Sequence, residues 1–344
     1  MANSKFPLLK LPYLGQKHVV SIMTTSERIR YSLLSKNAEE LIKTLRLKAA
    51  YLQLTFNDNI VTVHSSYEDR LEEWLIPTEN EHVECLLSIS PDIVKSIDEE
   101  TKDINIVVKK PEFKTIRDWL DHISDALKCR KLKIIFDGLA YYKPPIEISD
   151  LLQGYNISSV SCTICNPPLI GDIMEAFPEV REWELEAHPF EGDQKERFLS
   201  RSLDFFQTLS RFHIGIENLL QMDCKVIRIN ELTAQQTNRF LRHWISSGTN
   251  RNLESLSAPF KEYEGYQQDL FNGIQYSAVP EERCRVSNVP NLSEFFPDVI
   301  VVQFEIRRQS DGRKATIQLE QIYDFIHFRI KSLPISDSLR TNLS

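Results

Sequence analysis

The stretch FPLLKLPYLGQKHVVSIMTTSERIRYSLLSKNAEELIKTLR, residues 6–46, opens with an apolar segment and then divides into three short helical signals. Pro7 and Pro12 predict that the first segment is an extended arm, because a residue before proline avoids the helical region. Three helices of about ten residues each bury little surface, so such a unit is marginal alone. It must offer apolar residues to a partner or pack them on the rest of the chain.

Each of the three helices has a sequence signal. The first is expected from about Gly15 to Met23, and the spacing of Thr24 and Glu27 is that of a capping box beginning the second. Ser35 is expected to cap the third. In that helix apolar residues recur at i, i+3, i+4 and i+7, namely at Ala38, Leu41, Ile42 and Leu45.

Composition narrows the class of protein. The 344 residues suffice for two domains or for one large domain with an appendage. A formal charge of −8 lacks the electrostatic footprint of a protein that binds nucleic acid or an anionic membrane. The chain has no run of about 18 apolar residues, and its start does not resemble a secretory signal. We therefore expect an intracellular protein, in the cytoplasm or the nucleus.

After residue 48 the chain alternates between β-prone runs and helical patterns. Hairpins are predicted around Asn57–Asn59 and around Asp311-Gly312. Between them, helix–strand units recur about every 25 to 30 residues, in the range of leucine-rich repeats, although the full repeat signature is absent. This alternation predicts parallel strands with crossover helices. Residues 198–209 are predicted to be helical. Residues 322–330 fit a strand or a short helix, and the strand is favoured because Tyr, Phe and Ile predominate.

One further helix is marked at both ends. Thr233 and Gln236 form a capping box, and Gly248 is placed to end the helix. Its predicted inner face consists of Phe240, Leu241, Trp244 and Ile245.

The sequence gives only weak evidence for a catalytic or metal-binding site. Cys162 and Cys165 form a C-x-x-C motif, which could be interpreted as part of a zinc site or as a redox-active pair. A zinc site needs two more ligands that the sequence does not supply, so core packing is the favoured interpretation. His243 could be drawn as a general base, but no motif ties a nucleophile to it. No phosphate-binding loop and no G-x-S-x-G is present, so we expect a non-catalytic protein without cofactor or metal.

The N-terminal stretch resembles an F-box of the type found in the large nematode F-box families. The resemblance rests on Phe6–Pro12 (FPLLKLP), on the helix with Val19, Val20, Ile22 and Met23, on Leu33–Lys36 and on the basic end at Lys43–Arg46. It implies an F-box at residues 4–47 followed by an α/β substrate-recognition domain at residues 48–335. That second domain would consist of irregular, leucine-rich-repeat-like helix–strand units.

A second segment, His213–Phe260, resembles the type 2 F-box-associated domain of the same nematode proteins, and places this domain near residues 198–260. The matching residues are Leu219, Leu220, Cys224–Ile227, Leu232, Thr233, Asn238, Phe240, Leu241, His243, Trp244 and Asn252–Glu254. The order of the two segments supports both resemblances.

Together the resemblances imply a substrate-recognition subunit of an SCF-type cullin ubiquitin ligase. The F-box would dock on a Skp-type adaptor, and the larger domain would bind a protein target that the sequence does not name. The predicted adaptor-binding residues are Leu8, Leu11, Pro12, Val19, Val20, Met23, Ile29, Leu33 and Leu34. Some of these must form the core of the three helices. The alternative is a leucine-rich-repeat-like interaction scaffold, without a ligase role, whose helical head only caps the repeats.

Overall fold

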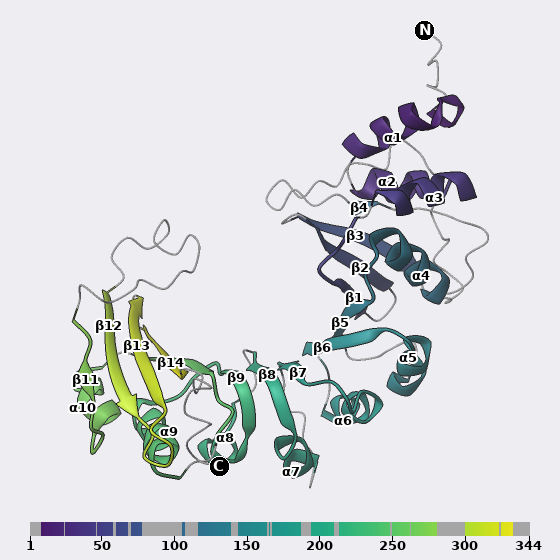
Figure 1. The fold of residues 1–344 in the computed structure, drawn as a ribbon. Helices are drawn as coiled ribbons and strands as arrows, with labels where there is room; N and C mark the ends of the chain where they lie inside the picture. Colours follow the sequence, from purple (N-terminus) through teal and green to yellow (C-terminus); the bar gives the residue numbers. More distant parts are fainter. Residues whose placement is uncertain are drawn as a thin grey trace, which may run out of the picture. The chain divides into compact units, whose positions relative to one another are not determined.

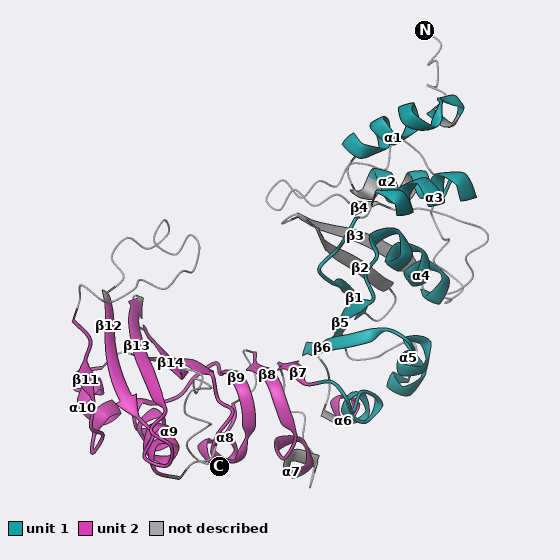
Figure 2. Ribbon diagram, viewed as in Figure 1, with its two compact units in different colours: residues 1–165, 172–180 teal, residues 166–171, 181–344 magenta. Residues whose placement is uncertain are grey.

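The computed structural model describes the following residues: 8–23, 25–45, 47–57, 60–67, 70–77, 105–106, 116–138, 144–163, 165, 167–186, 194–209, 213–247, 250–261, 263–280, 300–322 and 325–332. Within them the protein is mixed α/β, with ten α-helices, one 3-10 helix and fourteen strands (Figure 1). The predicted mixed α/β class is confirmed. The chain forms two compact units, residues 1–165 with 172–180 and residues 166–171 with 181–344 (Figure 2).

The first unit begins with three short helices and continues as a layer of strands with helices. Its elements are η1 (Leu8–Lys10), α1 (Tyr13–Ile22), α2 (Thr25–Ser32), α3 (Lys36–Thr44), β1 (Leu52–Asn57), β2 (Ile60–Tyr67), β3 (Arg70–Pro77), β4 (Asn105–Ile106), α4 (Ile116–Leu127), β5 (Lys131–Asp137), α5 (Pro145–Leu151) and β6 (Asn156–Thr163). Helix α6 (Pro167–Ala176) contributes residues to both units.

The strands of the first unit lie in the order β6-β5-β1-β2-β3-β4. The β1–β2 pair is antiparallel and confirms the predicted hairpin, whereas β5 runs parallel to β1 and to β6. Alternate residues of β1 and β5 are buried, as period-two alternation requires. Phe56 and Phe136 stack at 5.5 Å between ring centres within this core.

The second unit alternates strands and helices and then closes with a meander. Its elements are β7 (Glu182–Leu185), α7 (Gln194–Leu199), β8 (Ser202–Thr208), α8 (Ile216–Gln221), β9 (Asp223–Arg228), α9 (Ala234–Ser247), β10 (Ser255–Lys261), α10 (Tyr266–Phe271), β11 (Ser277–Ala278), β12 (Ile300–Arg307), β13 (Lys314–Ile322) and β14 (Phe325–Ser332). Strands β7 to β10 run parallel, with helices between them, and β14, β13, β12 and β11 add antiparallel neighbours.

Two local predictions about secondary structure are wrong. Leu8–Lys10 form a 3-10 turn, closed by a hydrogen bond from the Leu11 N–H to the Leu8 carbonyl, and not an extended arm. Residues 198–209 are not one helix, because α7 ends at Leu199 and β8 begins at Ser202. The apolar residues of that run have a nearly helical spacing, but pairing with β7 and β9 makes the second part a strand.

Two helix starts are confirmed by their hydrogen bonds. Ser35 Oγ accepts a hydrogen bond from the Ala38 N–H at 3.1 Å and caps α3. At α9 the bonds are reciprocal, since Gln236 N–H donates to Thr233 Oγ1 and Thr233 N–H donates to Gln236 Oε1. The predicted box at Thr24 and the helix end at Gly248 lie outside the described residues. The Asp311-Gly312 hairpin joins β12 to β13 as predicted.

Candidate functional site

The three N-terminal helices, called here the helical head (residues 8–44), are held together by polar contacts around a small apolar core. Gln16 donates to the Leu11 carbonyl at 2.7 Å and accepts from the Tyr31 hydroxyl at 2.7 Å. The Arg28 guanidinium donates to the carbonyls of Val20 and Ser21, which lie in the last turn of α1. Gln16 of α1 and Arg28 of α2 therefore fix the two helices against each other.

The predicted adaptor-binding residues separate into three groups by their burial in the helical head. Val20 and Ile29 are fully buried, so they pack the head together and cannot contact an adaptor directly. Leu34 and Pro12 are exposed. The others are partly buried: Leu8, Leu11, Val19, Met23 and Leu33.

The structure also exposes large apolar side chains that the sequence reasoning did not select. Leu14 and Ile22 are 76% and 74% exposed, and Tyr13 is exposed beside them in α1. Ile22 belongs to the same predicted helix as Val19 and Val20, whereas Tyr13 and Leu14 lie before its predicted start and in the first turn of the observed α1. Only knowledge of which side of α1 packs against α2 would have separated them from the core. Among the described residues of the head, Tyr13, Leu14, Ile22 and Leu34 are thus the large apolar side chains left exposed.

A serine, a histidine and a glutamate of the first unit come together in an arrangement that resembles a catalytic triad. Ser32 Oγ lies 2.8 Å from His122 Nε2, and Glu39 Oε1 lies 4.0 Å from His122 Nδ1. However, Ser32 and His122 are buried, and Ser32 donates its hydroxyl proton to the Ile29 carbonyl. A nucleophile needs access to substrate, so the arrangement joins α2 and α3 to α4 and does not form an active site.

The C-x-x-C motif also has a structural role. Cys162 and Cys165 are both buried, and the Cys165 thiol donates to the carbonyls of Thr163 and Phe136. Burial raises the pKa of the Cys162 thiol, which keeps it protonated and unreactive. Among the residues that the structure describes, no group of three or more His, Cys, Asp and Glu side chains could hold a metal ion.

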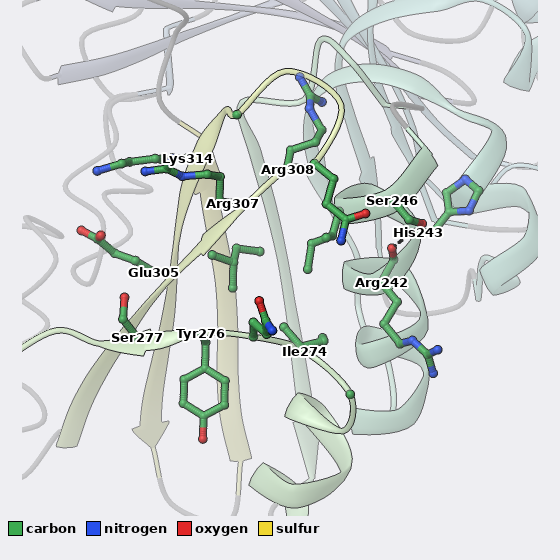
Figure 3. A pocket seen from close by; sticks show the side chains of 16 residues that line it. Arg242, His243, Ser246, Ile274, Tyr276, Ser277, Glu305, Arg307, Arg308 and Lys314 are labelled. Carbon is green, nitrogen blue, oxygen red and sulfur yellow. Dashed lines mark hydrogen bonds between the residues drawn. The ribbon is translucent and has the colours of Figure 1, made fainter.

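The second unit contains an open pocket of about 980 Å³ at the end of β12 (Figure 3). Helix α9 supplies one wall with Arg242 and Ser246, and residues 273–277 supply another. Strands β12 and β13 contribute Glu305, Arg307 and Lys314. In Figure 3 the side chains of Arg307 and Lys314 lie side by side, whereas Arg242 points away from them. The lining of this pocket contains more cationic than anionic side chains, although the chain as a whole is acidic.

Arg308, which follows Arg307 in the chain, has a structural role. It is 1% exposed and forms two hydrogen bonds to Asp311, from Nε at 3.0 Å and from Nη2 at 2.6 Å. Its guanidinium also lies 5.1 Å from the centre of the Trp244 ring. The pair lowers the pKa of Asp311, chiefly through these hydrogen bonds. Arg308 thus fastens the β12–β13 turn to α9 and positions the neighbouring Arg307.

Helix α9 also brings a serine and a histidine to the pocket. Ser246 donates its hydroxyl to the Arg242 carbonyl, and His243 points away from the other labelled side chains in Figure 3. The arginine and lysine side chains that line the pocket suit the binding of an anionic group.

Comparison with known families identifies the segment beside this pocket. Residues 195–258, from α7 to β10, match the model of the F-box associated family. This segment is similar to the F-box associated domain. The resemblance drawn from residues 213–260 is thereby confirmed, and an F-box-type substrate adaptor is the general class of function that this family suggests.

One relative extends the similarity beyond this domain. The chain is 22% identical to F-box associated domain-containing protein sdz-33 of Caenorhabditis elegans over 335 residues, which is 94% of this chain and 97% of the relative. No solved structure matches the chain. Among the helices that the structure describes, none is both long enough and apolar enough to cross a membrane.

The residues that carry the F-box associated resemblance are mainly core residues. Those that are fully buried are Leu219, Cys224, Ile227, Phe240, Leu241, Trp244 and Leu253. Asn238 is also buried and donates to the carbonyls of Leu270 and Asn272, which ties α9 to the end of α10. The matching residues therefore reflect the packing of this segment and do not indicate which of its surfaces binds a partner.

Proposed function

We propose that this protein is the substrate-recognition subunit of an SCF-type cullin ubiquitin ligase. The helical head acts as an F-box that docks on a Skp-type adaptor, which in turn contacts a cullin, and the α/β domain binds a target protein. The similarity to the F-box associated domain carries this proposal, because its family and the relative sdz-33 are both described by association with an F-box.

The exposed apolar residues of the head support a docking role. The helical head already has its own buried core. Leu14, Ile22 and Leu34 are exposed and not part of that core, so they are available to contact a partner. Burial of an apolar side chain of this size in an interface contributes about 1.5–3 kcal/mol each before the costs of association. A few such residues therefore suffice for a specific contact.

In this role the protein performs no chemistry and needs no cofactor. It acts by proximity, because holding a target near a ubiquitin-charged enzyme raises the effective concentration of the target lysines. The function is intracellular, in the cytoplasm or the nucleus.

Co-purification with Skp-type adaptors tests the proposal. Wild-type protein should bind an adaptor, and Leu14→Asp with Ile22→Asp should abolish binding. Ile146→Asp is the matched control, since Ile146 is also an exposed apolar residue but lies in α5, outside the helical head. The original candidates are tested by Leu11→Ala with Pro12→Ala. If wild type binds no adaptor, or if all variants bind as wild type does, the ligase role is wrong.

A second function is favoured by one observation. The buried Ser32–His122 contact joins the helical head to α4, which is what a cap on a leucine-rich-repeat-like scaffold requires. Hydrogen exchange separates the two functions. The exposed side of α1 should gain protection only with adaptor if it is a docking module, whereas a cap would show full protection in the isolated protein.

A further inference from the structure

A group of cations gathers on one face of the strands in the second unit. Strand register places them together, because residues directly opposite each other on neighbouring strands share a face. Arg228 of β9 is opposite Ser257, and Ser257 is opposite Arg329 of β14. Lys331, two positions further along β14, lies on the same face as Arg329. A row of basic side chains therefore begins at β9 and reaches β14.

The same face continues on β13 and β12. Lys331 is opposite Thr316, and Lys314 lies two positions before Thr316 on the same side of β13. Lys314 is in turn opposite Arg307 of β12. We call the five cations the basic face: Arg228, Arg307, Lys314, Arg329 and Lys331.

This face is the solvent side of the strands. In β14, Ile326, Phe328 and Ile330 are buried, and Lys331 is exposed between buried neighbours. Arg228, Arg307 and Lys314 are exposed as well, and Arg329 is partly exposed. On the same face, Gln318 and Glu320 of β13 are buried, whereas His327 of β14 is exposed.

The five charges are not neutralised within the part of the chain that the structure describes. Other cations of the second unit do have acidic partners: Arg181 and Lys225 pair with Asp204, and Arg239 pairs with Glu217. The described residues supply no such pair for any member of the basic face. Glu305, opposite Thr316, is the one exposed carboxylate among the described residues in the same rows on β12–β14.

Folding alone gives no reason for this arrangement. Arg307 and Lys314 face each other directly, and like charges in opposed positions destabilise a strand pair. Arg228 lies over the Phe205 ring at 5.3 Å, which orients its guanidinium while the N–H groups at its edge can take an anion. Half-buried hydroxyls of Ser255, Ser257 and Thr316 lie between the cations as additional donors.

We propose that the basic face binds an acidic, extended segment of the target protein. Alternate side chains of an extended chain repeat at about 6.8 Å, which matches residues such as Arg329 and Lys331 along one strand. Carboxylates at that spacing would meet successive cations, and Arg307 and Lys314 would hold one end at the rim of the pocket. This inference rests on the proposed recognition function and names the chemistry of its target.

A fluorescent peptide of about eight residues with alternating glutamate and serine tests the proposal by anisotropy with the full-length chain. Wild type should bind it, and binding should weaken at least about tenfold in about 0.5 M salt. Lys314→Glu with Lys331→Glu should weaken binding by at least about tenfold, as should the milder Lys314→Gln with Lys331→Gln. Lys36→Glu with Lys48→Glu is the matched control, because it changes the net charge equally at exposed positions of the first unit.

Four further probes test whether negative charge is required and which source of it is preferred. A glutamine peptide should not bind, and a phosphoserine version shows whether phosphate is preferred to carboxylate on the same face. Tighter binding to a single-stranded oligonucleotide or to phosphatidylserine vesicles would overturn the assignment to a protein segment. Unchanged peptide binding by both double variants, or no binding by wild type, would also overturn it.

Adaptor co-purification of the same variants distinguishes failure of this inference from failure of the proposed function. If the variants keep the adaptor and also keep the peptide, only the inference is wrong. If wild type binds the peptide through the basic face but binds no adaptor, the acidic-segment site stands and the ligase role is wrong.

Discussion

Ser32 Oγ of α2 lies 2.8 Å from His122 Nε2 of α4, a buried contact between residues 90 positions apart in the chain. Because Ser32 gives its own proton to the Ile29 carbonyl, its oxygen accepts from the imidazole N–H. We expect Ser32→Ala to lower the free energy of unfolding by about 1–3 kcal/mol, since the buried histidine N–H loses its partner. Denaturant titration measures this change.

The control for this prediction is Ser21→Ala, which removes an exposed serine hydroxyl in α1. It should change the free energy of unfolding by less than about 0.5 kcal/mol. Equal effects of the two substitutions would show that the Ser32–His122 contact does not stabilise the attachment of the helical head to α4.

Asp311 and Arg308 predict a stability difference that depends on pH. The hydrogen bonds from Arg308 hold the pKa of Asp311 below its unfolded value of 3.8. The stabilisation is therefore fully present above that unfolded pKa and is lost as the pH falls through the folded pKa. Asp311→Asn should lower the free energy of unfolding at pH 7 by about 2 kcal/mol, because the buried guanidinium loses a charged acceptor.

Thermal unfolding across pH checks this prediction. The difference between wild type and Asp311→Asn should disappear as the wild-type carboxylate becomes protonated in acid. A difference that stays constant from pH 7 into that acidic range would mean that the substitution acts through the turn geometry and not through the ion pair.

The reciprocal capping bonds at the start of α9 predict a coupled pair. Thr233→Ala should lower the free energy of unfolding by about 1 kcal/mol through loss of the cap. Gln236→Ala should have a smaller effect, and the double variant should cost less than the sum of the two, because each residue satisfies a backbone N–H of the other. Gln268→Ala, at an exposed position of α10, is the matched control. Strict additivity would contradict the capping box.

Exposed and buried apolar residues of the helical head should differ sharply in their effect on stability. Leu14→Ser should leave the free energy of unfolding within about 0.5 kcal/mol of wild type. Ile29→Ala should lower it by about 2–5 kcal/mol, because Ile29 is fully buried. Hydrogen exchange of the helical head should show the same difference, with reduced protection in Ile29→Ala and wild-type protection in Leu14→Ser. A large loss of stability in Leu14→Ser would show that Leu14 packs the head and does not form a docking surface.

The sequence by itself determined the local features of this protein. The caps at Ser35 and Thr233, the turn at Asp311-Gly312 and the β1–β2 hairpin follow from side chains that act on backbone groups a few positions away. Helix α4 was predictable for a similar reason, since its apolar face repeats within one segment. The F-box associated domain was recognisable because buried residues such as Trp244 carry its pattern.

Only the tertiary structure decided what depends on distant partners. Residues 202–208 became a strand because β7 and β9 offer their hydrogen-bonding edges. Packing against the rest of the head buried Ile29 and left Leu14 exposed, although both belong to apolar helices of the same stretch. The basic face exists only through register, which brings Arg228 and Arg329 to opposite sides of Ser257 although they are 101 positions apart (329 − 228). Pairing between remote segments leaves no local signal, so one sequence does not reveal such a surface.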